Sequence, residues 1–427
     1  HYPGRAALPY ARDGHDPDVT WERIGVLARM ARGGETPPLV VASAAAVAAH
    51  TLRPADLGRG PGAVARGARL GLEAFALDLV EAGYEMAPLV EAPGQAARRG
   101  GLVDVYPPGA PAPVRVEFFG PEVDSIRTFD PETQRTTGTL DEVRIGPATE
   151  WFPTREEVNR LADHLDEVTS REARDELHLL RAGTLSAPDF TGPMAVDATI
   201  LDHLRRDWLL VLDEREAVEA ACADLDDLAG ERRDELAKRG ELDARAPFQH
   251  EHAGALRVAI DAHAARVELG RWVTGAEPAA VRVPFRQADA YAGRLTDAAR
   301  DAYRQQQRGD RLVVVTQQAQ RYAEILREEG IEASVTERVP ERPARGTVAL
   351  LQGTLPEGWV IQGPDGIIAL QTDRELFGFV KRRRTLRQRA ATHRSRFLAE
   401  VSPGDFVVHA DHGIARFGGI IKREVDG

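Results

Sequence analysis

The sequence predicts a chain of several α/β domains, and three observations support this fold class. Its 427 residues exceed what one hydrophobic core usually holds, since a domain has about 100–200 residues. Apolar residues three and four apart alternate with short continuous apolar runs, a pattern typical of helices that alternate with buried strands. Clusters of glycine and proline separate these stretches and indicate domain boundaries. We therefore expect about three to four domains.

The composition indicates a globular protein and excludes several classes. Hydrophobic residues make up 43% of the chain and charged residues 29%, as in folded domains. Because the chain lacks an apolar run of about 18 residues and starts at His1 without a signal peptide, we expect a cytoplasmic protein that does not interact with membranes. The single cysteine, Cys222, excludes an internal disulfide and a cysteine-rich zinc site. The missing initiator methionine suggests a piece of a larger protein.

Residues 1–61 form the first predicted domain. Helices are expected over 21–30 and 44–50, where apolar residues recur with helical spacing. The apolar run at 39–41 predicts a short buried strand between them. The glycine-rich stretch 58–62 breaks the pattern and ends the domain.

Residues 62–147 predict a compact α+β domain. A helix is expected over 72–82, and a turn at 107–109 follows the first of three strands. These strands are expected at residues 101–106, 114–119 and 125–129.

The second of these strands carries the most informative pattern. Side chains alternate between the two faces of a strand, so the valines and Phe118 form one apolar face. The other face receives Arg115, Glu117 and Phe119. Arginine and aromatic residues dominate the binding energy of many protein interfaces, so this face is a candidate binding surface, which Arg99 could join. The alternative is that Phe119 folds under a neighbouring loop.

Residues 148–300 form the third predicted domain. Between two helices, the apolar run 208–212 predicts a buried parallel strand that ends at Asp213 and Glu214. The two long helices are expected over residues 156–181 and 214–241.

Asp213 and Glu214 resemble the carboxylates that bind Mg²⁺ in nucleotide hydrolases. A phosphate-binding loop also needs a lysine that follows a glycine. None of the three lysines follows a glycine: Lys238, Lys381 and Lys422. We interpret the acidic pair as a non-catalytic remnant, and a nucleotide-binding enzyme that uses Asp213 and Glu214 is the alternative.

The last predicted segments are a small α/β domain at 301–380, a basic linker helix at 381–400, and a segment at 401–427 whose short apolar runs, separated by glycines, indicate β-strands and turns. The small domain should contain strands at 312–315, 347–351 and 366–370 and a helix at 318–329. Residues 381–396 contain eight Lys or Arg and no acid. This segment either connects domains in solvent or contacts nucleic-acid phosphates or an acidic protein.

Several motifs resemble the bacterial transcription-repair coupling factors. Residues 99–107, 115–120 and 122–135 resemble a module that this family shares with the excision-repair protein UvrB. Residues 372–378 and 404–417 are similar to the coupling factors alone, and the latter resemble the opening of their CarD-like, RNA-polymerase-interacting domain.

The resemblance implies a degenerate helicase-like UvrB-homology module with an inserted α+β domain. Residues 1–61 would be its subdomain 1a, truncated at the start, 62–147 the UvrA-binding insertion, and 148–300 subdomain 1b. The small α/β domain at 301–380 follows, and 401–427 would begin a truncated CarD-like, Tudor-like β-barrel.

The resemblance also implies function. The insertion would recruit UvrA through Arg99, Arg115 and Phe119, and the barrel would bind the RNA polymerase β subunit near Arg423. The full-length parent would be an ATP-dependent DNA translocase that contacts DNA mainly through a C-terminal motor holding ATP and Mg²⁺. This part would be no enzyme and would need no cofactor and no metal. Alternatives are UvrB itself, which should have a phosphate-binding loop near its start, and a stand-alone CarD-like regulator.

Overall fold

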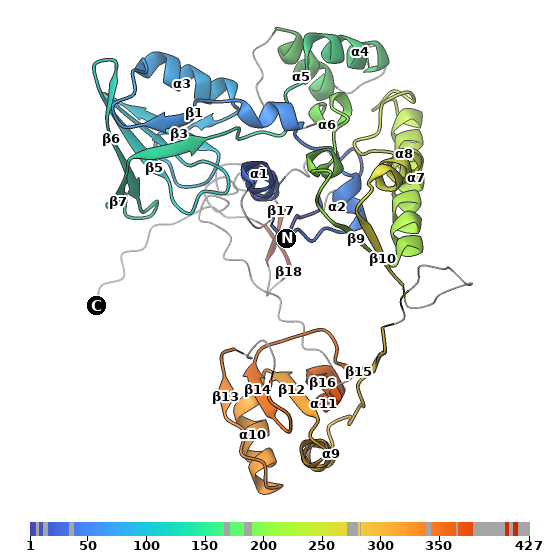
Figure 1. Ribbon diagram of the computed structural model, residues 1–427. Helices are drawn as coiled ribbons and strands as arrows, with labels where there is room; N and C mark the ends of the chain where they lie inside the picture. Colours follow the sequence, from blue (N-terminus) through green and yellow to red (C-terminus); the bar gives the residue numbers. More distant parts are fainter. Residues whose placement is uncertain are drawn as a thin grey trace. The chain divides into compact units, whose positions relative to one another are not determined.

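The computed structural model describes residues 1–378, apart from 6–7, 12–15, 34–37, 166–170, 183–189, 271–280, 282, 339–342 and 364–365, and the backbone of 406–409 and 413–416. The chain divides into two compact units, His1–Trp272 with Ala390–Gly427, and Val273–Arg389 (Figure 1).

The first unit begins with helix α1 (Pro17–Arg32), whose N-terminus is capped by the Asp16 side chain. Helix α2 (Ala44–Ala48) and the 3-10 helix η1 (Pro54–Gly58) follow. The strand expected at 39–41 is wrong, because Leu39 and Val41 are exposed and lie in irregular chain. A run of three apolar residues is too short to identify a strand by itself.

A six-stranded sheet forms the centre of the inserted domain, with the order β2-β3-β4-β5-β6-β7. Its strands are β2 (Glu85–Met86), β3 (Gln95–Arg99), β4 (Leu102–Val105), β5 (Val114–Phe119), β6 (Glu122–Phe129) and β7 (Thr136–Leu140). Helix α3 (Leu72–Glu81) packs on one face, where the ring centroids of Phe75 and Phe118 are 5.5 Å apart. The helix expected at 72–82 and all three expected strands are confirmed within a few residues.

The two ends of the inserted domain are paired with each other. Strand β1 (Gly62–Ala65) runs antiparallel to β8 (Glu142–Ile145), with Gly62 opposite Ile145. The chain thus enters and leaves the domain side by side, as expected for an insertion.

Two close contacts at glycine residues hold the inserted domain against α1. A Cβ atom on Gly25 of α1 would lie 2.9 Å from the Cα atom of Gly109, in the turn between β4 and β5. A Cβ atom on Gly94 would overlap the Trp21 indole of the same helix. Only glycine leaves room for these contacts: the backbones meet directly at Gly25 and Gly109, and at Gly94 the backbone of the domain packs on the Trp21 side chain.

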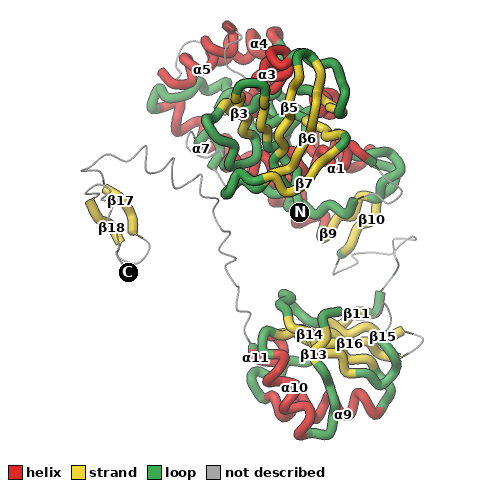
Figure 2. Tube along the Cα trace, turned by 90° about the vertical axis from the view of Figure 1, so that its left-hand side faces the viewer, coloured by secondary structure: helices red, strands yellow, loops and turns green. Residues whose placement is uncertain are grey.

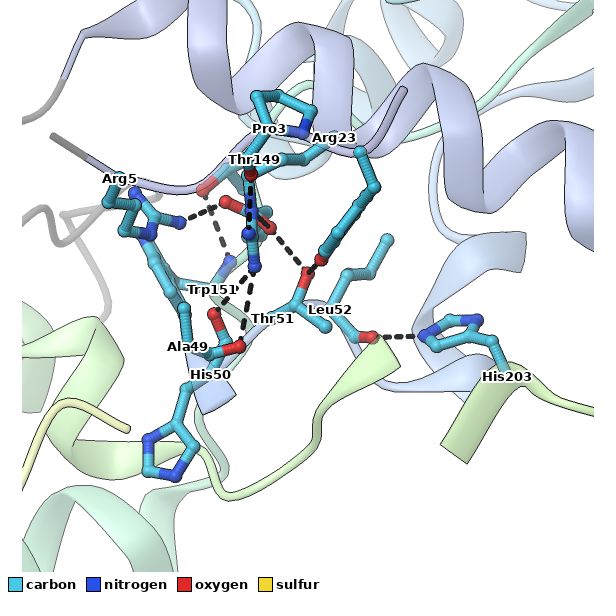
Figure 3. A network of polar contacts seen from close by, with 12 residues as sticks. Pro3, Arg5, Arg23, Ala49, His50, Thr51, Leu52, Thr149, Trp151 and His203 are labelled. Atoms are coloured by element: carbon cyan, nitrogen blue, oxygen red, sulfur yellow. Dashed lines mark hydrogen bonds and ion pairs between the residues drawn. The ribbon is translucent and has the colours of Figure 1, made fainter. Parts of the chain in front are cut away.

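A buried ion pair joins distant segments of the first unit (Figure 3). The Arg23 guanidinium donates from Nε to Glu150 Oε1 at 2.8 Å and from Nη1 to the Pro3 carbonyl at 3.0 Å. Arg5 and Thr51 also donate to the Glu150 carboxylate. Burial alone would raise the pKa of Glu150, but the two arginines and Thr51 hold it below its usual value. These contacts tie the N-terminus and α1 to the chain that leaves the inserted domain.

The rest of the first unit is mainly helical. Its elements are α4 (Arg155–Leu165), α5 (Arg171–Ala182), α6 (Gly192–Ala195), η2 (Ile200–His203), β9 (Leu210–Asp213), α7 (Arg215–Lys238), α8 (Ala253–Ala262) and β10 (Arg266–Leu269). Two helices, α4 and α5, replace the single helix expected at 156–181, whereas α7 confirms the helix at 214–241.

Strand β9 is parallel, as expected, and pairs with β10. It is not buried as predicted, because Val211 is 50% exposed, Leu209 just before the strand is 60% exposed, and Leu212 is the one buried residue of β9. Within the described residues this sheet has two strands, too few to enclose both faces.

The second unit contains another six-stranded sheet, with the order β11-β15-β16-β12-β14-β13. Its elements are β11 (Phe285–Gln287), α9 (Leu295–Gln307), β12 (Arg311–Thr316), α10 (Ala319–Glu328), β13 (Val335–Thr336), β14 (Val348–Gln352), β15 (Trp359–Gly363), β16 (Gly366–Thr372) and α11 (Asp373–Phe377). Residues of α9 and α10 share one hydrophobic core with the sheet, and Figure 2 shows both helices on one side of it.

The boundary expected at residue 301 lies too late in the chain. Strand β11 (Phe285–Gln287) pairs antiparallel with β15, and Ala298 and Ala299 of α9 belong to the core of the second unit. The unit therefore includes chain from Val273 onward. The three strands and the helix that the sequence predicted in this unit are confirmed.

Near the C-terminus, β17 (Phe406–His409) and β18 (Gly413–Arg416) form an antiparallel hairpin with Val408 opposite Ile414. The basic linker at 381–400 and Arg423 lie outside the described residues. None of the helices in the described part of the chain is long and apolar enough to cross a membrane.

The glycine contact between α1 and the inserted domain generates the first prediction. We expect Gly25→Ala to destabilise the protein, because overpacking against backbone costs about 1–3 kcal/mol. Gly230→Ala is the matched control, because Gly230 also lies in a helix but has open space around it. That change should stabilise the protein by up to about 1 kcal/mol. Urea unfolding checks this, and equal stabilisation by both changes would contradict the contact.

Buried His50 generates a second prediction, on pH. Burial lowers the pKa of His50 to about 4, and its Nδ1 lies 2.6 Å from the Pro193 carbonyl oxygen. The unfolded chain binds this proton near pH 6.5, so the stability that neutral His50 provides is present above pH 6.5 and is lost as the pH falls toward 4. At pH 5 the loss should be about 2 kcal/mol.

The measurement is urea unfolding at pH 7 and pH 5. In His50→Gln the loss of stability between these values should shrink by roughly 2 kcal/mol, while half-buried His203 and buried His250, whose pKa values burial also lowers, stay in place. An identical pH dependence in the variant would refute the assignment to His50.

Candidate functional site

The outer face of the sheet in the inserted domain, opposite α3, is the candidate site. Along β5 the side chains alternate as the sequence predicted, with Val114, Val116 and Phe118 buried and Phe119 exposed. We define the binding face by its three predicted residues: Arg99, Arg115 and Phe119.

A buried carboxylate that the sequence did not single out brings the two arginines together. Asp104, on β4, lies opposite Arg115 of β5 in the strand register. Its Oδ1 accepts from Arg115 Nε at 2.7 Å, and its Oδ2 accepts from Arg115 Nη2 at 2.9 Å and from Arg99 Nη2 at 2.6 Å. The Asp104 side chain is only 2% exposed, so it holds both guanidinium groups from beneath.

Arg115 is further fixed by an aromatic ring. Its guanidinium carbon lies 4.8 Å from the centroid of the Phe129 ring, on β6. Its hydrogen bonds to Asp104 raise the pKa of Arg115, so the side chain is a permanent cation at any relevant pH. A stacked and doubly hydrogen-bonded arginine has little rotamer freedom left.

Phe119 lies at the end of β5 and is 82% exposed. It precedes Gly120, whose φ of 59° permits the tight turn into β6. The neighbouring turn holds Gly100 with the same φ, and the Gly101 carbonyl accepts from the Phe118 N–H at 2.9 Å. The two turns therefore lie side by side at one end of the sheet.

Other charged residues border the face. Glu117 accepts hydrogen bonds from Arg127 at 3.1 Å and from Ser125 at 3.0 Å. Arg98 points to the opposite face of the sheet, where it donates to Glu73 of α3 at 2.8 Å. Arg98 thus does not join Arg99, although the two are adjacent in sequence.

A small second core limits the face at its other end. Val90, Ala97 and Phe129 are buried together there, with Tyr106 against them. The open part of the sheet is therefore the end with the two glycine turns.

The arrangement suits protein recognition rather than catalysis. It presents an exposed aromatic side chain and two cations held by Asp104 on one face of the sheet, and aromatic and arginine side chains are enriched in binding hot spots. Among the residues that the structure describes, no three His, Cys, Asp or Glu side chains are placed to hold a metal ion.

Asp213 and Glu214 lie elsewhere in the first unit and do not form a nucleotide site with a lysine. Asp213 ends β9, and Glu214 precedes α7 with a φ of 55°. Lys238, the one lysine in the described part of the chain, is the last residue of α7. At 1.5 Å per helical residue it is roughly 35 Å from the acidic pair.

Comparison with known protein families and proteins agrees with this architecture. Residues 63–151 match the UvrB interaction domain, and residues 401–427 match the CarD-like/TRCF RID domain. A transcription-repair-coupling factor of Myxococcus xanthus is 30% identical over 100% of the chain, and that of Bacillus subtilis is 28% identical over 96% of it.

The chain is therefore similar to one part of the transcription-repair-coupling factors. It spans 36% of the Bacillus subtilis protein and 38% of the Myxococcus xanthus protein. The coupling factor of Haemophilus influenzae is 36% identical over a shorter region that covers 35% of the chain. The first family match coincides with the domain that carries the binding face.

The contrast between two neighbouring phenylalanines generates a third prediction. Phe118→Ala should cost about 3–5 kcal/mol of stability, because it removes a buried ring from the core under α3. Phe119→Ala should change stability by no more than about 0.5 kcal/mol, because its ring is in solvent. Urea unfolding of both variants checks this, and a large loss in Phe119→Ala would mean that its ring is packed.

Proposed function

We propose that this chain is the part of a transcription-repair coupling factor that recruits UvrA to stalled RNA polymerase. The observation that carries the proposal is the binding face: an exposed Phe119 on the same sheet face as Arg99 and Arg115, in the domain matched as the UvrB interaction domain. Such a face can dock a protein partner without rearranging, because its arginines are already held in place.

The second half of the proposal concerns the polymerase. Residues 401–427, which match the CarD-like/TRCF RID domain, begin the segment that binds the polymerase β subunit, with Arg423 near the contact. An exposed strand edge offers unpaired N–H and C=O groups for such docking. The chain would then connect two partners, UvrA at the inserted domain and polymerase near the C-terminus.

In this proposal the chain itself is no enzyme, uses no cofactor, and acts in the cytoplasm. The whole protein is an ATP-dependent DNA translocase whose motor holds ATP and Mg²⁺, contacts DNA and displaces the polymerase. The long separation between Lys238 and the Asp213–Glu214 pair supports an adaptor over a nucleotide-binding enzyme.

Substitutions on the face test the proposed function. Arg115→Ala and Phe119→Ala should each weaken binding to purified UvrA about thirtyfold, since truncating a central interface residue costs about 2 kcal/mol or more. Biolayer interferometry gives the dissociation constants.

Arg98→Ala is the matched control, because Arg98 of β3 is an arginine of the same sheet that points to the opposite face. It should leave the affinity unchanged. Undiminished binding by both Arg115→Ala and Phe119→Ala, or an equal loss in Arg98→Ala, would remove the face from the proposal.

A further inference from the structure

We propose that Asp104 is the positioning residue of the binding face, and that its buried carboxylate holds Arg99 and Arg115 in the geometry that the partner recognises. This inference rests on the proposed function of the face. It assigns a role to a residue that no partner can contact directly, because the Asp104 side chain is 2% exposed.

The geometry shows how one carboxylate serves two arginines. Oδ1 is used by Arg115 alone, whereas Oδ2 accepts one hydrogen bond from each arginine, at 2.6 and 2.9 Å. Charge-assisted hydrogen bonds of this length are among the strongest in proteins. The three side chains together carry one net positive charge, so the face stays cationic.

The cost of burying a charge explains why Asp104 has this effect. Asp104 lies between Val103 and Val105, which point into the core on the other side of the sheet. A buried carboxylate is unfavourable unless cations and hydrogen bonds compensate it. Both arginines are therefore drawn onto Asp104, and any rotamer that releases them leaves the carboxylate unpaired.

This restraint matters for binding because free arginines lose side-chain entropy when a partner orders them. Immobilising a long, flexible side chain on association opposes binding. Asp104 makes that loss occur at folding, before the partner arrives. Phe129 supports the same geometry by stacking under Arg115.

The pair between Glu73 and Arg98 provides a natural control. Glu73 also accepts a hydrogen bond from an arginine of β3, but both side chains are largely exposed and lie on the opposite face. Glu73→Gln thus removes a similar ion pair without touching the binding face.

The first experiment needs no partner. In the full chain, NMR of arginine Nε–H groups should show slow solvent exchange for Arg115 and fast exchange for exposed Arg98. Asp104→Asn, which keeps the side-chain size but offers an amide N–H₂ to the guanidinium, should make Arg115 exchange fast as well. Fast exchange of Arg115 in the unchanged protein would overturn the inference, whether or not UvrA binds.

The second experiment measures affinity for UvrA. Asp104→Asn should weaken binding about tenfold, within the range of coupling energies between contacting residues, and Glu73→Gln should not weaken it. Added to Arg99→Ala and Arg115→Ala together, Asp104→Asn should cause no further loss, because no arginine remains to be positioned.

The two outcomes that matter are distinguishable. Wild-type affinity in Asp104→Asn, or the same tenfold loss without the two arginines, would overturn the positioning role. Absence of UvrA binding by the unchanged chain would overturn the proposed function, while slow exchange of Arg115 in that chain would still support the restraint by Asp104.

Discussion

The buried carboxylate of Asp104 is the constraint on which the binding face depends. It is enclosed by the sheet and must be compensated, and the two available cations are Arg99 and Arg115. The burial of the Asp104 carboxylate, and not contact with a partner, sets the positions of these two arginines. The exposed ring of Phe119 lies on the same face as these ordered cations, at the end of the sheet away from the small core around Phe129.

The face is useful only if the inserted domain is firmly held, and the first unit supplies that support. The backbones of Gly25 and Gly109 meet without intervening side chains. Immediately after the domain, the buried Glu150 carboxylate forms ion pairs with Arg23 and Arg5. Helix α1 contributes to both contacts, so it fixes the insertion from two sides.

Sequence pattern predicted the local part of this structure and missed the long-range part. Alternation along one strand placed Arg115 and Phe119 outward, because that depends only on the period of a strand. It could not find Asp104, since the pairing of Asp104 with Arg115 depends on strand register. The one sequence signal for Asp104 was an acidic residue between two valines of a strand, Val103 and Val105.

The boundary before β11 also depends on a long-range pairing, because Phe285 joins its sheet through β15, more than 70 residues later. Strand β9 was predicted to be buried because its apolar run does not reveal how many neighbours it has.

The central claim is that UvrA binds the end of the sheet where the two glycine turns meet. Hydrogen–deuterium exchange of the whole chain, with and without UvrA, tests it most directly. The account predicts slower exchange in residues 99–101 and 114–122, with strand β12 of the second unit unchanged as the internal reference. Unchanged exchange in those residues, together with protection elsewhere in the chain, would contradict it.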